Sequence, residues 1–351
     1  MPEGPHRPQR GATTIEEVAR AAGVSRQTVS NAINAPHRVR PQTLERVTAA
    51  IRELGYQPDQ SARSLRSGAR RVLGYLAPVG DPLDPNPLMA GFLEALVDAA
   101  GAEGQRVLLC RPAPSAAIDE LVASRQVDGL VVADVLERDP RIAHLAGLGV
   151  PFVSFGRTGP GEPQHWVDIA NEAAMSTVVR HLAAQGHRRI GYLGVPSAPP
   201  WMAARQAGFL AEAHRLGLSP APPASTVPAV RALLRGPDRP TAFAAGNDLL
   251  ALDVYEAVRA EGLTVGPTAT AIAVTGFHDT PLSRHLHPPL TSVRLPLRAI
   301  ATALIARLLP QIRGEAPPTT GLELPTDLIP RASSAAPQAG PERHRAGAPF
   351  G

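Results

Sequence analysis

Polar side chains of the types that read base edges in DNA are concentrated in one short segment: Arg26, Gln27, Thr28, Ser30 and Asn31. A guanidinium can donate two hydrogen bonds to guanine, and a carboxamide can both donate to and accept from adenine. Ser25, Thr14 and Asn34 are of types that contact DNA phosphates or cap helices. Such chemistry requires a scaffold that turns these side chains outward.

The surrounding residues predict a helix-turn-helix as that scaffold. Thr14 and Glu17 have the spacing of a capping box, and Gly23 suits the left-handed residue that ends a helix. A second helix is expected over residues 25–34, and a third begins at Pro41. We therefore predict that residues 12–57 form a small all-α DNA-binding domain with the base-reading side chains on its surface.

The charge of the chain is concentrated near its N-terminus. Residues 1–71 hold twelve arginines against six acidic side chains, whereas residues 72–351 hold 23 arginines against 25 acidic side chains, and lysine is absent. A basic module joined to a mildly acidic body is typical of a protein that binds a polyanion.

The segment Gly23-Val24-Ser25, followed by Thr28-Val29-Ser30 and Ile33-Asn34, closely resembles the signature of the LacI/GalR family of regulators. The resemblance implies that Arg26 and Gln27 meet base edges in the major groove. It further implies that Thr28, Ser30 and Asn31 lie along the same groove, and that Thr14, Ser25 and Asn34 contact the backbone of double-stranded DNA. A palindromic operator would require a homodimer.

Residues 58–70 read in isolation as a flexible linker, because a short helix does not persist alone in water. In the resembling family this segment is a hinge helix that orders on DNA. Leu65 then matches a leucine that wedges into the minor groove, with Ala62 packed beside it. Residues 1–11 and 331–351 are rich in Pro, Gly, Ala and Arg, and we expect both to be disordered.

From residue 71 to 330, short apolar runs alternate with helical stretches, which predicts an α/β fold with two lobes of parallel sheet and a ligand cleft between them. The strands are expected at 72–77, 107–109, 129–133, 152–154, 190–193, 241–245 and 271–275. Many blocks in this region also match the periplasmic-binding-protein-like body of the same regulators.

The resemblance implies that Arg205, Asn247, His278 and Asp279 line an effector cleft, with Arg157 and Asn86 at its edge. Donors and acceptors together suit the hydroxyls of a sugar or sugar derivative. Arg205 could instead form an interface salt bridge, and Asn247 could cap a helix.

Two departures from the family pattern bear on the ligand. His278 stands where relatives usually carry an aspartate, and Ala170 stands where an aspartate usually precedes Asn171. Trp201 could provide a platform on which a sugar ring stacks, or it could pack on the surface.

The sequence thus predicts a DNA-binding repressor whose operator affinity is controlled by a small molecule, with no cofactor, no metal, no catalytic residue and no membrane partner. The alternative is a sugar-binding protein of the transport type, against which the helix-turn-helix and the lack of a signal peptide both argue. An enzyme is disfavoured because no nucleophile elbow, phosphate loop or metal-ligand spacing occurs. The single Cys110 is expected in a reducing cytoplasm.

Overall fold

The computed structural model describes residues 13–56, 70–76, 87–111, 115–159, 164–195, 199–268, 270–316 and 321–335. The chain divides into two compact units, Met1–Arg70 and Arg71–Gly351.

The first unit is built from short helices around one core. They are α1 (Ile15–Ala22), α2 (Arg26–Asn34), the 3₁₀ turn η1 (Pro36–Arg38) and α3 (Pro41–Leu54). The predicted capping box is confirmed, because the amide of Glu17 donates to Thr14 Oγ1 while the amide of Thr14 donates to Glu17 Oε2. Val18, Val29 and Val47 bring one apolar side chain from each helix into a fully buried contact.

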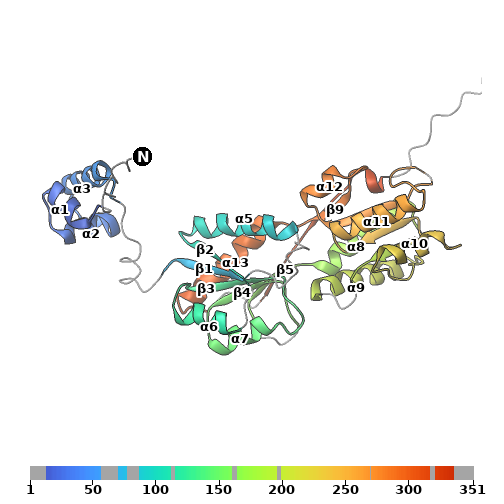
Figure 1. Ribbon diagram of the computed structural model, residues 1–351, viewed down its shortest axis with the longest axis horizontal. Coiled ribbons are helices and arrows are strands. Elements are labelled where there is room, and N and C mark those ends of the chain that lie inside the picture. The colour runs from blue at the N-terminus through green and yellow to red at the C-terminus, as the bar shows by residue number, and fades with distance from the viewer. Residues whose placement is uncertain are drawn as a thin grey trace, which may run out of the picture. The chain divides into compact units, whose positions relative to one another are not determined.

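Lobe 1 of the second unit is a six-stranded parallel sheet in the order β10-β5-β4-β3-β1-β2 (Figure 1). Its strands are β1 (Val72–Leu76), β2 (Arg106–Cys110), β3 (Gly129–Ala133), β4 (Phe152–Phe155), β5 (Trp166–Ile169) and β10 (Gly321–Leu324). Helices pack on both faces of this sheet, with two helices on each face. They are α5 (Pro87–Ala102) and α13 (Leu297–Ile312) on one face, and α6 (Ser115–Ala123) and α7 (Pro140–Leu148) on the other.

Lobe 2 is a five-stranded sheet in the order β11-β9-β8-β7-β6, in which only β11 runs antiparallel to its neighbour. Its strands are β6 (Ile190–Leu193), β7 (Ala242–Ala245), β8 (Ala273–His278), β9 (Thr291–Arg294) and β11 (Asp327–Ile329). Its helices are α8 (Asn171–Ala184), α9 (Pro200–Arg215), α10 (Val227–Arg235), α11 (Asp248–Ala260) and the short α12 (Pro281–His285).

The chain passes between the lobes three times, after β5, after β9 and after β10. The two-lobed α/β prediction is confirmed, but the sequence pattern missed four strands, β5, β9, β10 and β11. All four lie at or next to a sheet edge, and each spans only three or four residues, too few for a periodic pattern to be recognised.

The prediction that disorder begins at residue 331 is wrong. Arg331 hydrogen-bonds the carbonyl of Leu290, and a 3₁₀ turn, η2 (Ala332–Ser334), follows it. Ser333 is fully buried, where its hydroxyl donates to the carbonyl of Val274 and accepts from the amide of Thr291. The composition of this segment resembles that of a linker, yet its polar atoms have partners in distant strands. Residues 336–351 lie outside the described residues.

Candidate functional site

Helix α2 presents the predicted base-reading side chains at its beginning. Ser25 caps the helix by accepting from the amide of Thr28, and their hydroxyls are 2.9 Å apart. The Arg26 side chain is 70% exposed and forms an ion pair of 3.1 Å with Glu16 of α1. Gln27 Nε2 donates to Asn31 Oδ1, one helical turn further on, at 3.0 Å. The first turn of α2 therefore offers a row of exposed donors and acceptors.

The prediction that Ser30 is one of the outward-facing, base-reading side chains is wrong. Its side chain is only 7% exposed, so it does not remain on the outside of α2. Ser30 neighbours the buried Val29 and lies one turn before Ile33, which places it at the flank of the inner face. Asn34 ends the same helix, and its side chain is outside the described residues, as are Ala62 and Leu65.

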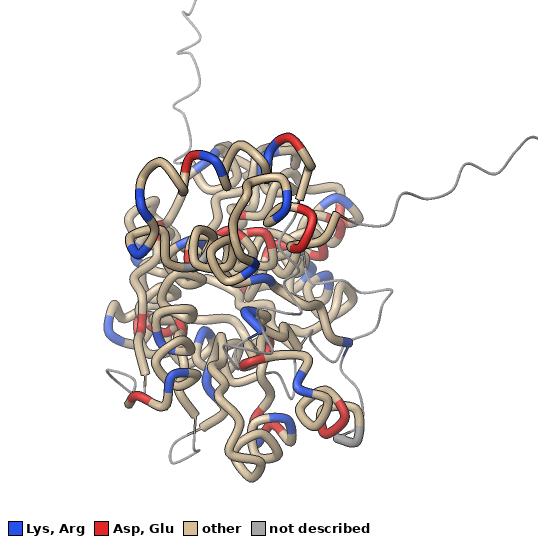
Figure 2. The backbone as a smooth tube through the Cα atoms, turned by 90° about the vertical axis from the view of Figure 1, so that its left-hand side faces the viewer, with Lys and Arg blue, Asp and Glu red and all other residues tan. Residues whose placement is uncertain are grey.

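The arginines of the described part of the first unit are all exposed: Arg20, Arg26, Arg38, Arg40, Arg46, Arg52 and Arg70. Figure 2 marks the arginines and the acidic residues along the backbone, and between Glu17 and Glu45 the sequence holds four arginines and no acidic residue. Exposed guanidinium groups of this kind are suited to phosphate contacts.

A cavity that is partly open to solvent lies between the lobes; the non-atom space there is about 380 Å³ with the open solvent included. Strand ends and helices of both lobes contribute its polar lining: Asp134, Asp168, Arg205 and His278. Its apolar lining includes Met89, Phe155 and Trp201. The location, at the carboxyl ends of parallel strands, is the usual one for ligands in open α/β folds.

Arg205 of α9 is fixed in the wall of this cavity. Its guanidinium donates to Asn171 Oδ1 (2.9 Å), to the carbonyl of Gly246 (2.7 Å) and to His278 Nε2 (3.1 Å). The same group lies 3.6 Å from the ring centroid of Phe277 and 4.5 Å from that of Trp201. Burial lowers the pKa of Arg205 to about 9, so it remains charged at neutral pH.

A close helix crossing positions α9. A Cβ added at Gly208 would lie 2.3 Å from the backbone oxygen of Glu172 in α8, so only glycine allows the two backbones to approach this closely. Trp201 and Arg205 lie on the turns of α9 that precede this contact. The crossing thereby determines the distance at which both side chains face lobe 1.

His278 is buried and electrically neutral. Because an arginine N–H can only donate, His278 Nε2 must accept, and the ring proton resides on Nδ1. Burial and the neighbouring Arg205 charge hold the pKa of His278 well below its usual value. Its backbone has a φ of +109°, a conformation that non-glycine residues rarely adopt and that often occurs at functional sites.

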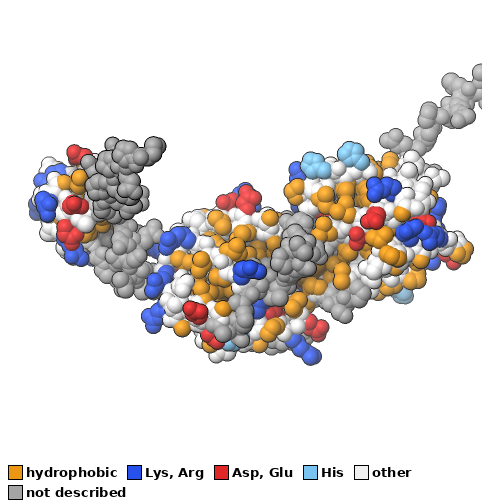
Figure 3. Space-filling model, viewed as in Figure 1, with side chains coloured by type: hydrophobic (Ala, Val, Ile, Leu, Met, Phe, Trp, Pro, Cys, Tyr) orange, Lys and Arg blue, Asp and Glu red, His pale blue; other side chains and the backbone are white. Residues whose placement is uncertain are grey.

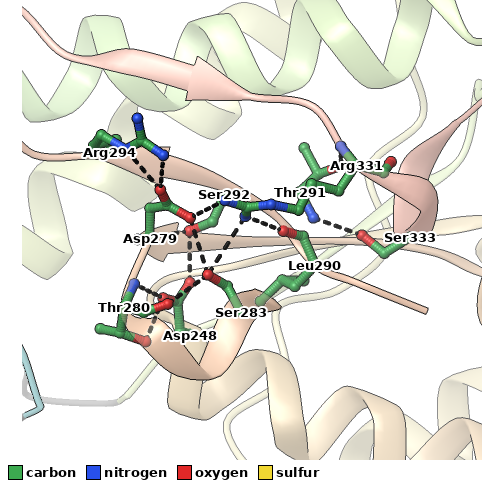
Figure 4. Close-up of polar contacts among 10 residues, drawn as sticks. All are labelled: Asp248, Asp279, Thr280, Ser283, Leu290, Thr291, Ser292, Arg294, Arg331 and Ser333. Atoms are coloured by element: carbon green, nitrogen blue, oxygen red, sulfur yellow. Dashed lines mark hydrogen bonds and ion pairs between the residues drawn. The ribbon is translucent and has the colours of Figure 1, made fainter. Parts of the chain in front are cut away.

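A buried polar cluster holds the turn that follows His278 (Figure 4). Asp279 forms ion pairs of 2.6 Å with both Arg294 and Arg331, and it accepts a hydrogen bond from the hydroxyl of Ser283. The prediction that Asp279 lines the effector cleft is therefore wrong, because its carboxylate is fully buried among these partners. These contacts hold the turn next to His278 in place.

The two carboxylates of the cavity, Asp134 and Asp168, were missed by the sequence analysis. Asp134 follows β3 in lobe 1, and its Oδ1 accepts a hydrogen bond of 3.1 Å from Trp201 Nε1 in lobe 2. Asp168 in β5 accepts from Asn171 Nδ2 at 3.2 Å, a local contact where the chain passes from lobe 1 to lobe 2. Burial raises the pKa of both side chains, that of Asp168 to about 6.

The remaining predicted cleft residues lie elsewhere. Asn247 caps α11 by accepting from the amide of Leu250 at 2.8 Å, as the alternative interpretation proposed. Arg157 is an edge residue of lobe 1 that pairs with Glu323 at 2.9 Å and lies 4.0 Å from Asp168. Asn86 is outside the described residues.

Among the described helices, none combines the length and the apolar character needed to cross a membrane. The described residues also hold no group of three or more metal-binding side chains.

Comparisons with known proteins agree with this architecture. Residues 14–59 match the family described as "Bacterial regulatory proteins, lacI family", and residues 179–334 match the "Periplasmic binding protein-like domain". The HTH-type transcriptional regulator CelR of Thermobifida fusca is 31% identical, over 93% of this chain and 99% of that protein.

Two solved structures extend the likeness to three dimensions. A complex of the transcriptional regulator CelR with cellobiose has a TM-score of 0.67 and 29% identity over 92% of this chain and 99% of that chain. The lac repressor dimer bound to operator and the anti-inducer ONPF has a TM-score of 0.77 and 27% identity over 93% of this chain and all of that chain. With an N-terminal helix-turn-helix and a two-lobed body, this chain belongs to the LacI family of DNA-binding transcriptional regulators.

Proposed function

We propose that this protein is a dimeric transcriptional repressor whose affinity for a palindromic operator is set by a sugar-type effector in the cavity between the lobes. The observation that carries the proposal is that polar groups of both lobes meet in the cavity, where Trp201 of lobe 2 donates a hydrogen bond to Asp134 of lobe 1. A ligand that contacts these residues would favour one arrangement of the lobes. It would shift operator affinity by the difference in its affinity for the two arrangements.

In this proposal α2 enters the major groove, with Arg26 and Gln27 at base edges and with Thr28 and Asn31 beside them. Thr14 and Ser25 contact the DNA backbone. The ion pair between Arg26 and Glu16 is exposed at both ends and therefore contributes at most about 1 kcal/mol. Arg26 can thus leave Glu16 for a guanine at little cost.

Fluorescence anisotropy with palindromic duplexes that have a central CG step tests the DNA-binding part. Binding to one palindrome should exceed binding to a scrambled duplex of equal composition, and Arg26→Ala should cost roughly 1–3 kcal/mol and relax specificity at one base pair. Arg52→Ala, an exposed position in the last turn of α3, is the matched control. Equal weakening on all sequences by Arg26→Ala would contradict the assignment of Arg26 to base reading.

The effector part of the proposal places the ligand against Arg205, His278, Asp134 and Asp168, with Trp201 as a stacking surface. The similarity to a regulator solved with cellobiose supports a sugar as the ligand class. A thermal-shift screen of mono- and disaccharides on the full chain, followed by anisotropy on the operator with each hit, tests it. The hit should change operator affinity and remain unconsumed; a hit that stabilises the protein without altering DNA binding contradicts effector control.

The proposed dimer uses an apolar surface on lobe 1. Leu109 of the edge strand β2 is 56% exposed. Leu108 of the same strand and Val97 of helix α5 are also exposed. Figure 3 shows hydrophobic side chains gathered over these two elements. We expect Leu109→Glu to convert the protein to a monomer in sedimentation velocity and to weaken operator binding. Leu148→Glu, on an exposed leucine at the end of α7, should remain dimeric.

A further inference from the structure

The cavity between the lobes has an imbalance of charge. Its described lining holds two carboxylates, Asp134 and Asp168, and one cation, Arg205. His278 adds no positive charge, because its Nε2 accepts from Arg205 and its pKa lies well below the neutral range. With both carboxylates ionised, the lining carries one more negative than positive charge.

The guanidinium of Arg205 does not compensate either carboxylate directly. Its hydrogen bonds go to Asn171, the Gly246 carbonyl and His278, and its faces contact aromatic rings. Among the described residues, the cation nearest to Asp168 is the Arg157 guanidinium at 4.0 Å, which is 41% exposed and shared with Glu323.

Asp134 is compensated even less. Its carboxylate accepts one hydrogen bond from the neutral indole of Trp201, and no ion pair to it occurs within the described part of the chain. The guanidinium of Arg141 bonds the carbonyl of Asp134 but pairs with the carboxylate of Asp139.

The weak compensation affects the pKa of both carboxyl groups. Burial raises the pKa of Asp134 and Asp168, because desolvation outweighs the hydrogen bonds and charges that favour their ionised forms. Buried carboxylates are ordinarily paired with a cation, and those that are not paired occur mainly at functional sites. The missing partner is a positive charge inside the cavity.

We propose that the effector carries a protonated amine, as an amino sugar does, and that this ammonium group lies between Asp134 and Asp168 beside the rings of Trp201 and Phe155. Carboxylates supply charge and hydrogen-bond acceptors to an ammonium, and aromatic faces attract cations. This inference rests on the proposed function, because it names the class of sugar that the cavity selects.

Three disaccharides with the same β-1,4 linkage test the inference by calorimetry on the full chain at pH 7. They are cellobiose, the disaccharide of glucosamine, and the disaccharide of N-acetylglucosamine, in which an amide replaces the charged amine. The glucosamine disaccharide should bind at least tenfold more tightly than either neutral compound.

Substitutions in the cavity identify the groups responsible. Asp134→Asn and Asp168→Asn should each reduce the affinity for the glucosamine disaccharide by tenfold or more, while they change the affinity for cellobiose less. Asp98→Asn removes a carboxylate that is 58% exposed on α5 and should leave all affinities unchanged. Thermal melting of each variant verifies that it is folded.

The outcomes separate the inference from the function on which it rests. If cellobiose or the N-acetyl compound binds as tightly as the amine, the amine inference is overturned and the sugar effector stands. A preference for the amine that survives in the Asp134→Asn/Asp168→Asn double variant also overturns it. If none of the three disaccharides binds, and no sugar in the thermal-shift screen does, both proposals fail.

Discussion

Helix α2 and the cavity between the lobes each depend on an arginine, and the surroundings of the two side chains differ in every respect. Arg26 is 70% exposed, has one surface ion pair, and belongs to nine consecutive residues whose caps are local. Arg205 is 2% exposed and is held by three hydrogen-bond partners and two aromatic rings, which come from α8, α9, β8 and the loop after β7. Exposure and a single surface ion pair leave Arg26 free to take other partners, whereas Arg205 is fixed by the fold.

The largest expected effect comes from removing the fixed arginine. Arg205→Ala would leave the acceptors on Asn171 and Gly246 without their donor and open a void beside Phe277. We expect a loss of about 3–5 kcal/mol in the free energy of unfolding of the body, measured by urea denaturation. Arg205→Lys keeps the charge without the planar set of donors, so it should recover less than half of the loss. A stability within 1 kcal/mol of the parent would show that Arg205 is not part of the scaffold.

The pH dependence of stability tests the carboxylate of Asp168 in the cavity. Burial raises the pKa of Asp168 to about 6 in the folded protein. The charges of Arg157 and Arg205 lower this pKa, and the charge of Glu323 raises it, but burial has the largest effect. Because the folded state binds this proton more tightly than the unfolded state does, stability falls as pH rises from about 4 to about 6.

Asp168→Asn should therefore remove that fall and stabilise the ligand-free protein at pH 7 by up to about 3 kcal/mol, from about 1.4 kcal/mol per pKa unit. Urea denaturation of both proteins at pH 4 and pH 7 provides the measurement. A difference between them that is the same at the two pH values would refute the raised pKa.

A smaller effect is expected at the link between the lobes. Trp201→Phe keeps a ring against Arg205 and removes only the hydrogen bond to Asp134, which should cost about 1 kcal/mol of stability. The same change should increase the fraction of open lobes, which small-angle X-ray scattering of the ligand-free protein detects as a larger radius of gyration. Trp166→Phe, which removes the other tryptophan, is the control; an equal change in both variants would argue against a link at Trp201.

The smallest effect on stability is expected at the exposed arginine. Arg26→Ala should change the free energy of unfolding by no more than about 0.5 kcal/mol, although it weakens operator binding. Thermal melting followed by circular dichroism measures the stability, and the anisotropy measurement gives the operator affinity of the same variant. Substantial unfolding by Arg26→Ala would mean that α2 depends on the Glu16 ion pair, and the contrast between the two arginines would disappear.

Local signals account for how well the first unit could be predicted. The capping box of Thr14 and Glu17, the cap at Ser25 and the left-handed Gly23 all involve residues within a few positions of each other, and each is present. Ser30 is the exception, because its exposure depends on the neighbouring helices rather than on its own residue type.

The effector site was predicted less completely for a physical reason. Arg205 and His278 do line the cavity, but Asp134 and Asp168 are single carboxylates after and within apolar strands, and no spacing along the chain relates them. Asp279 was misplaced because one of its partners, Arg331, lies 52 residues further on in a segment with the composition of a linker.

The sequence by itself determined the helix-turn-helix and the two-lobed α/β body, since caps, periodicity and strand ends are encoded over short distances. The placement of Arg205 and His278 at a cleft came from the resemblance to the family. Only the tertiary structure decided which polar groups face the cavity, which serve the fold and how the lobes are joined. Whether a buried carboxylate is paired depends on side chains that meet only after the chain has folded, and that pairing determines the charge of the ligand proposed for this cavity.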